Sequence, residues 1–235
     1  MTEPVRLAKR VAEQFSCSRR EAEIFIEGGY VTVDGRVIEE PQFRVSDEVI
    51  VLLPDATLTA AEPVTIVLHQ PVADGVHVPV DINAENHAVD DASGIRSLKR
   101  HFSRLTTALP LDPQAGGLAV LTQDWRVTRK LVDNASTVEQ EYVVEVASEL
   151  GSTDLKQLER RSAMNGRDLP PAKVSMQSET RLRFAVKGPQ PGQIAYLCAN
   201  AGLNVISIKR IRIGRIAMAR LLPGQWRYLP AQERF

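Results

Sequence analysis

The chain has 235 residues, 43% hydrophobic and 25% charged, which is typical of a globular protein with one or two domains. Its 29 basic and 29 acidic residues give a formal net charge of zero, so overall charge provides no argument for a nucleic-acid partner. The two cysteines have no disulfide or metal-ligand spacing, and neither a signal peptide nor a membrane-spanning apolar run is found. We therefore expect a cytoplasmic protein without a bound metal.

The first 53 residues predict a small domain of two helices followed by a hairpin. Apolar residues with helical spacing between residues 5 and 15 indicate the first helix. In Ser18-Arg19-Arg20-Glu21 the Ser18 hydroxyl and the Glu21 carboxylate can form a capping box, which predicts the start of the second helix. Asp34-Gly35 between two β-branched runs predicts the turn of the hairpin.

Two arginines in the first turn of the second helix are locally unfavourable, because basic side chains there oppose the helix dipole. Arg19 and Arg20 therefore suggest a purpose outside the helix, namely contact with phosphates. Residues 6 to 53 resemble the RNA-binding domain named after the fourth small-subunit ribosomal protein. The resemblance implies a binding face for structured RNA formed by the following residues: Arg6, Lys9, Ser18, Arg19 and Arg20.

A second domain is predicted over residues 64–235, after a polar linker at 54–63 that has proline at both ends. Periodicity predicts strands at 64–68, 141–146 and 181–186, and helices at 95–105, 125–132 and 153–162. Between residues 180 and 232 there is no acidic residue, whereas nine lysines and arginines occur. A segment of one charge sign favours a cationic surface suited to phosphates, although a solvated face without a ligand is the alternative.

The most informative stretch is Leu109 to Asp124, in which Asp112 lies between two prolines and precedes Gly116-Gly117 and an apolar run. Proline fixes φ and glycine allows a tight or left-handed backbone, so a rigid loop is expected to deliver Asp112 to the edge of a buried strand. Such a loop can hold a nucleophile or a base in place. From local chemistry alone, an aspartate that only caps a turn is the favoured interpretation.

The stretch resembles the active-site segment of the RNA pseudouridine synthases of the RsuA and RluF type. The shared residues are Leu111-Asp112, Gly117-Leu118, Leu121-Thr122 and Asp124, followed later by Glu141-Tyr142 and by the ending from Lys209 to Leu229. The resemblance implies an α+β fold: the small RNA-binding domain, then a synthase domain with a mixed, mainly antiparallel sheet flanked by helices. It also implies that uridine in ribosomal RNA is isomerised to pseudouridine by a monomeric enzyme without cofactor or metal.

Roles follow from the same resemblance. Asp112 is expected to be the catalytic aspartate, Tyr142 to pack against the extruded base, and Lys209 and Arg210 to hold neighbouring phosphates.

Three departures weaken the match. The family has arginine where this chain has Pro110, lysine at Gln70, and at Ala195 an arginine that pairs with the catalytic aspartate. They leave open a catalytically inactive RNA-binding relative that assists ribosome assembly.

Overall fold

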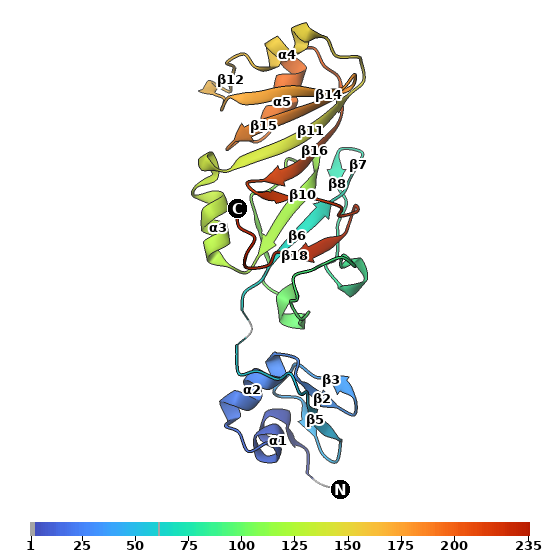
Figure 1. The fold of residues 1–235 in the computed structure, drawn as a ribbon, viewed down its shortest axis with the longest axis vertical. Helices are drawn as coiled ribbons and strands as arrows, with labels where there is room; N and C mark the ends of the chain where they lie inside the picture. The colour runs from blue at the N-terminus through green and yellow to red at the C-terminus, as the bar shows by residue number, and fades with distance from the viewer. Residues whose placement is uncertain (1–2, 61) are drawn as a thin grey trace. The chain divides into compact units, whose positions relative to one another are not determined.

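The computed structural model describes residues 3–60 and 62–235, without the side chains of 152–154, and the chain forms two units (Figure 1). The first unit contains residues 1–63 and 96–103, and the second contains 64–95 and 104–235. Residues 96–103, expected in the second domain, thus group with the first unit. One residue of the predicted linker, Ala61, lies outside the described residues.

The first unit has two helices beside short strands. Its elements are α1 (Leu7–Gln14), α2 (Arg19–Glu27), the pair β1 (Val5–Arg6) and β4 (Arg44–Val45), and a sheet of β2 (Val31–Val33), β3 (Arg36–Val37) and β5 (Ile50–Leu52). The predicted capping box is confirmed, because Ser18 Oγ accepts from the Glu21 amide and the Glu21 carboxylate accepts from the Ser18 amide. The predicted hairpin turn is also confirmed, with Asp34 and Gly35 both at positive φ.

The segment 96–103 is fastened to the first unit by charged side chains. The guanidinium group of Arg96 donates to the Gly29 carbonyl at 2.9 Å, pairs with Asp55 and lies 4.6 Å from the centre of the Tyr30 ring. Lys99 pairs with Glu40 at 2.8 Å. The predicted helix at 95–105 is reduced here to a single 3-10 turn, η2 (Lys99–Phe102).

The second unit is built on one nine-stranded sheet with the main order β14-β15-β11-β16-β10-β6-β18. The strands are β6 (Thr65–Gln70), β9 (Thr106–Ala108), β10 (Ala115–Thr122), β11 (Glu139–Val146), β14 (Ala172–Ser178), β15 (Arg181–Lys187), β16 (Val205–Ile213), β17 (Ile216–Ala217) and β18 (Trp226–Tyr228). Among these ladders only β10 and β16 run parallel. The expected α+β architecture with a mixed, mainly antiparallel sheet is confirmed.

Three helices accompany the sheet: α3 (Trp125–Val132), α4 (Ser152–Leu158) and α5 (Gln193–Asn200). Figure 1 shows α4 and α5 beside β14 and β15, and α3 towards the other end of the sheet. Each end has its own apolar core, one around Phe184 and Leu197 and one around Leu118 and Leu131. The smaller elements are η1 (Ala84–Asn86), η3 (Ala135–Thr137) and the hairpins β7 (Val72–Ala73) with β8 (Val76–His77) and β12 (Ala163–Met164) with β13 (Arg167–Asp168).

The acid-free segment does not form one continuous cationic surface. Four of its arginines form ion pairs: Arg181 with Glu145, Arg183 with Glu141, Arg212 with Glu139 and Glu141, and Arg227 with Glu233. At Arg181, Arg183 and Arg212 the expectation fails because antiparallel pairing places β11, with its acidic residues, beside the arginines of β15 and β16. Arg227 of β18 pairs instead with Glu233, six residues further along the chain.

Candidate active site and RNA interface

The loop that carries Asp112 runs between β9 and β10. Leu109 in the loop (φ 57°) and Gly117 near the start of β10 (φ 97°) have positive φ. β10 lies in the middle of the sheet between β6 and β16. The Asp112 side chain is partly buried, and its carbonyl accepts from the Ala115 amide at 2.9 Å. The sequence prediction of an ordered acid at the edge of a buried strand therefore agrees with the geometry.

Arg210 of β16 forms hydrogen bonds with the backbone on both sides of Asp112, which are the two arms of this loop. Its Nη2 donates to the Leu109 carbonyl and its Nε to the Leu118 carbonyl, both at 2.8 Å. Its Nη1 donates to Gln140 Oε1 at 3.1 Å. The side chain is only 1% exposed, and burial lowers the pKa of Arg210 while the nearby Tyr142 and Asp112 oppose that shift.

A histidine of the small β7–β8 hairpin supports the same loop from another direction. His77 Nε2 lies 3.0 Å from the carbonyl oxygens of both Asp112 and Ala115. Because both partners are acceptors, Nε2 must carry the proton and donate. The backbone on either side of Asp112 is thus fixed by two side chains that come from distant parts of the sequence.

The Asp112 carboxylate itself is bound at the beginning of α5. The Gly192 amide donates to Asp112 Oδ1 at 3.0 Å, and Gly192 is the N-cap residue of α5 with φ 78°. Helix amino termini stabilise anions through free amides and the helix dipole. Ala195, where the family has its arginine, lies in the first turn of the same helix. This helix end therefore gives Asp112 a backbone partner.

Tyr142 lies on β11 with its ring in the core and only 6% exposed. Its hydroxyl donates to Gln140 Oε1 at 2.7 Å, the same oxygen that accepts from Arg210. Burial raises the pKa of Tyr142, and Arg210 opposes that effect. Tyr142, Gln140 and Arg210 thus form one hydrogen-bonded group beside the loop.

A cavity of about 690 Å³ opens next to the loop. It is lined by Gln114, Gly116 and Gly117 of the loop and β10, by the beginning of β16 from Val205 to Lys209, and by residues following β6. Asp112 does not line it. Lys209 is exposed, so this predicted phosphate contact is free to meet a ligand from the cavity side.

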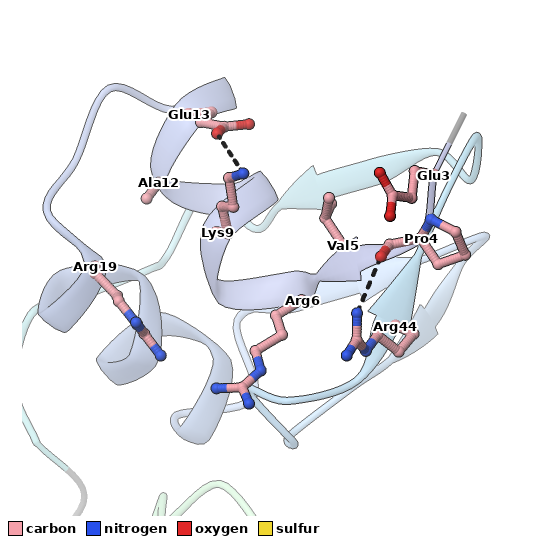
Figure 2. Close-up of a pocket in the computed structure, with 9 residues that line it drawn as sticks. All are labelled: Glu3, Pro4, Val5, Arg6, Lys9, Ala12, Glu13, Arg19 and Arg44. Carbon is pink, nitrogen blue, oxygen red and sulfur yellow. Dashed lines mark hydrogen bonds and ion pairs between the residues drawn. The ribbon is translucent and has the colours of Figure 1, made fainter.

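The first unit has a basic hollow of about 550 Å³. Figure 2 shows its lining, in which Arg6, Lys9 and Arg19 come from β1, α1 and α2. Lys9 lies 3.9 Å from Glu13, and Arg44 donates to the Pro4 carbonyl. Three of the five residues of this unit that are predicted to bind RNA therefore share this hollow, and the other two, Ser18 and Arg20, are exposed on and beside α2.

The structure corrects one predicted site residue and adds three that sequence reasoning missed. Arg210 is buried and cannot reach an RNA phosphate, because its guanidinium is occupied by three oxygens inside the unit. The missed residues are His77, Gln140 and Gly192. The alternation along β16, which puts Lys209 and Arg210 on opposite faces of the sheet, could have shown that only one of them is exposed.

Within the described residues, no group of three His, Cys, Asp or Glu side chains is arranged to hold a metal ion. No helix in that part of the chain is long and apolar enough to cross a membrane.

Comparison with known proteins finds relatives for both units of the chain. Residues 5–51 match the S4 domain family. The chain is 27% identical to ribosomal small subunit pseudouridine synthase A of Vibrio cholerae, covering 97% of each protein. It is 25% identical to an uncharacterised RNA pseudouridine synthase of Aquifex aeolicus, covering 97% of this chain and 94% of that one.

The chain is similar to pseudouridine synthases along nearly its whole length. The dual-specificity RNA pseudouridine synthase RluF of Escherichia coli is 27% identical over 97% of this chain and 77% of its own. A crystal structure of a pseudouridylate synthase superposes with a TM-score of 0.56, at 20% identity and 96% coverage of both chains. The pseudouridine synthase fold and the resemblance seen in the sequence are both confirmed.

Proposed function

We propose that the protein is an RNA pseudouridine synthase that isomerises uridine in ribosomal RNA, with Asp112 as the catalytic aspartate. One observation carries the proposal: the Asp112 carboxylate is held by the Gly192 amide, on a loop whose backbone is fixed by Arg210 and His77. A side chain that only capped a turn would not need support from three distant elements. The named relatives modify ribosomal RNA or RNA in general, which supplies the substrate class.

The reaction needs little beyond one carboxylate. The bond between uracil N1 and ribose C1′ breaks, a bond between C5 and C1′ forms, C5 loses a proton and N1 gains one. Atoms and electrons balance, so no oxidant, metal or nucleotide is consumed. Asp112 can serve as the nucleophile or as a base at C2′. Before either step the uridine must leave the RNA stack, at a cost of a few kcal/mol.

Tyr142 would pack against the extruded base, and its hydroxyl is already held by Gln140. Lys209 would hold a phosphate beside the cavity, and the basic hollow of the S4 domain would hold structured RNA through its backbone.

The alternative, an inactive RNA-binding relative, rests on Pro110, Gln70 and Ala195. Pro110 is exposed, and the Gln70 amide donates to the Pro71 and Val78 carbonyls, so neither residue disturbs the Asp112 loop. Ala195 replaces the family's arginine, but the Asp112 carboxylate still accepts a hydrogen bond from the Gly192 amide. We therefore favour the active enzyme over the inactive relative.

We also propose that it acts as a monomer in the cytoplasm, where bacterial ribosomal RNA is modified.

The test is release of tritium from ribosomal RNA labelled at uridine C5. Wild type should release tritium, whereas Asp112→Asn should be slower by about 10³-fold or more, because an amide is neither a nucleophile nor a base here. Asparagine keeps an oxygen that can accept from Gly192, so the loop is retained. Asp133→Asn, at an exposed carboxylate directly after α3, is the matched control and should match wild type. Release no faster than in buffer by wild type would contradict the proposal.

A further inference from the structure

Arg210 is a charged residue in a place where charge is costly. It lies on a central strand and is 1% exposed, while its neighbour Lys209 is exposed. A buried cation is tolerated in proteins only when its donors are satisfied. Here Nε, Nη1 and Nη2 each have an oxygen partner at 2.8–3.1 Å. The site is therefore built around this side chain.

Two of the three partners are the two arms of the catalytic loop. Leu109 comes three residues before Asp112 and Leu118 six residues after it, and their carbonyls bind different nitrogens of one guanidinium group. The planar arginine fork can bridge fixed acceptors in this way, whereas a lysine ammonium on a flexible stem holds one geometry poorly. The bridge sets the separation of the loop arms and hence the position of Asp112.

The third partner connects the loop to the proposed base-binding residue. Gln140 Oε1 accepts from both Arg210 and the Tyr142 hydroxyl. The loop that carries Asp112 and the Tyr142 side chain are thus connected through the same buried hydrogen bonds, those of Arg210 and Gln140.

We infer that Arg210 is a positioning residue that holds Asp112 in place. It does so from β16 and through the backbone of the loop, without touching the RNA. The inference rests on the proposed function for its catalytic meaning. Its structural content, a loop held closed by one guanidinium group, can be tested without activity.

The experiment compares Arg210→Lys with Lys209→Ala, its exposed neighbour. Single-turnover rates with saturating RNA, RNA affinity at several salt concentrations, and amide hydrogen exchange of residues 109–118 are measured on the full chain. Arg210→Lys should lower the rate by about 10- to 100-fold, because small displacements of a reacting group are costly. Its RNA affinity should stay within about twofold, and exchange in the loop should become faster. Lys209→Ala should weaken binding and reduce the salt slope by about one.

The inference is overturned if Arg210→Lys keeps the wild-type rate, or if it weakens binding and flattens the salt slope as Lys209→Ala does. Should Arg210→Lys not fold, Gln140→Met removes the third acceptor of Arg210 together with the partner of the Tyr142 hydroxyl, and an unchanged rate with unchanged loop exchange in that variant overturns the inference. A wild type without isomerase activity contradicts the proposed function instead. Loop exchange in Arg210→Lys then decides the inference alone, with unchanged exchange counting against it.

Discussion

Gly117 is the residue with the least freedom to change in the site. Its φ is 97°, and a Cβ atom there would lie 2.2 Å from the Arg210 carbonyl oxygen and 2.8 Å from the Arg210 nitrogen. Both are backbone atoms of the parallel neighbour β16, so they cannot rotate away. We expect Gly117→Ala to destabilise the protein by several kcal/mol, on the order of 3–5, as measured by urea unfolding.

Gly202→Ala is the control for Gly117→Ala. Gly202 also has positive φ, 73°, but a Cβ atom there meets no atom within 4 Å. Only the backbone strain remains, so the loss should be about 1 kcal/mol. Equal losses in the two variants would mean that the close approach of β10 and β16 is not what requires glycine.

At the scale of one element, the segment 96–103 should make stability depend on pH. His101 in η2 is 3% exposed, and burial lowers the pKa of His101 to about 4, from an ordinary value of 6.5. The folded state therefore resists protonation, and stability that is complete above pH 6.5 is lost as pH falls towards 4. Between pH 7 and pH 5 the loss should be about 2 kcal/mol.

The His101 effect is measured as a difference. His101→Phe keeps a buried ring but has nothing to protonate, so the loss of stability between pH 7 and pH 5 should shrink by that amount relative to wild type. Burial also lowers the pKa of His69 in the second unit, and this contribution cancels because both proteins contain His69. Parallel stability curves for the two proteins would refute the prediction.

Elements whose signal is local were predictable from the sequence. The Ser18 cap and the Asp34-Gly35 turn both form, because each depends on residues within a few positions of one another. The segment 95–105 fails as a helix because tertiary bonds from Arg96 and Lys99 decide its path. Sequence periodicity carries no information about such partners.

For the molecule as a whole, the resemblance located Asp112 but not what holds it. His77, Gly192 and Arg210 are 35, 80 and 98 residues away from Asp112 in the chain, and only the order of strands brings them together. The acid-free segment misled for the same reason, since pairing of β11 with β15 and β16 neutralises several of its arginines. Charge along a sequence predicts a surface only when neighbouring strands are known.

With a net charge of zero, the molecule has no general attraction for RNA, so affinity must come from local basic groups. The basic hollow of the S4 domain, here called the S4 hollow, supplies such groups, because Arg6 and Arg19 line it from different elements. We expect Arg6→Gln combined with Arg19→Gln to weaken binding of structured ribosomal RNA about tenfold or more and to lower the salt slope by about two, measured by filter binding. The exposed pair Arg160→Gln and Arg161→Gln removes the same charge elsewhere and should leave both quantities unchanged. Equal losses from the two double variants would show that net charge, and not the S4 hollow, governs binding.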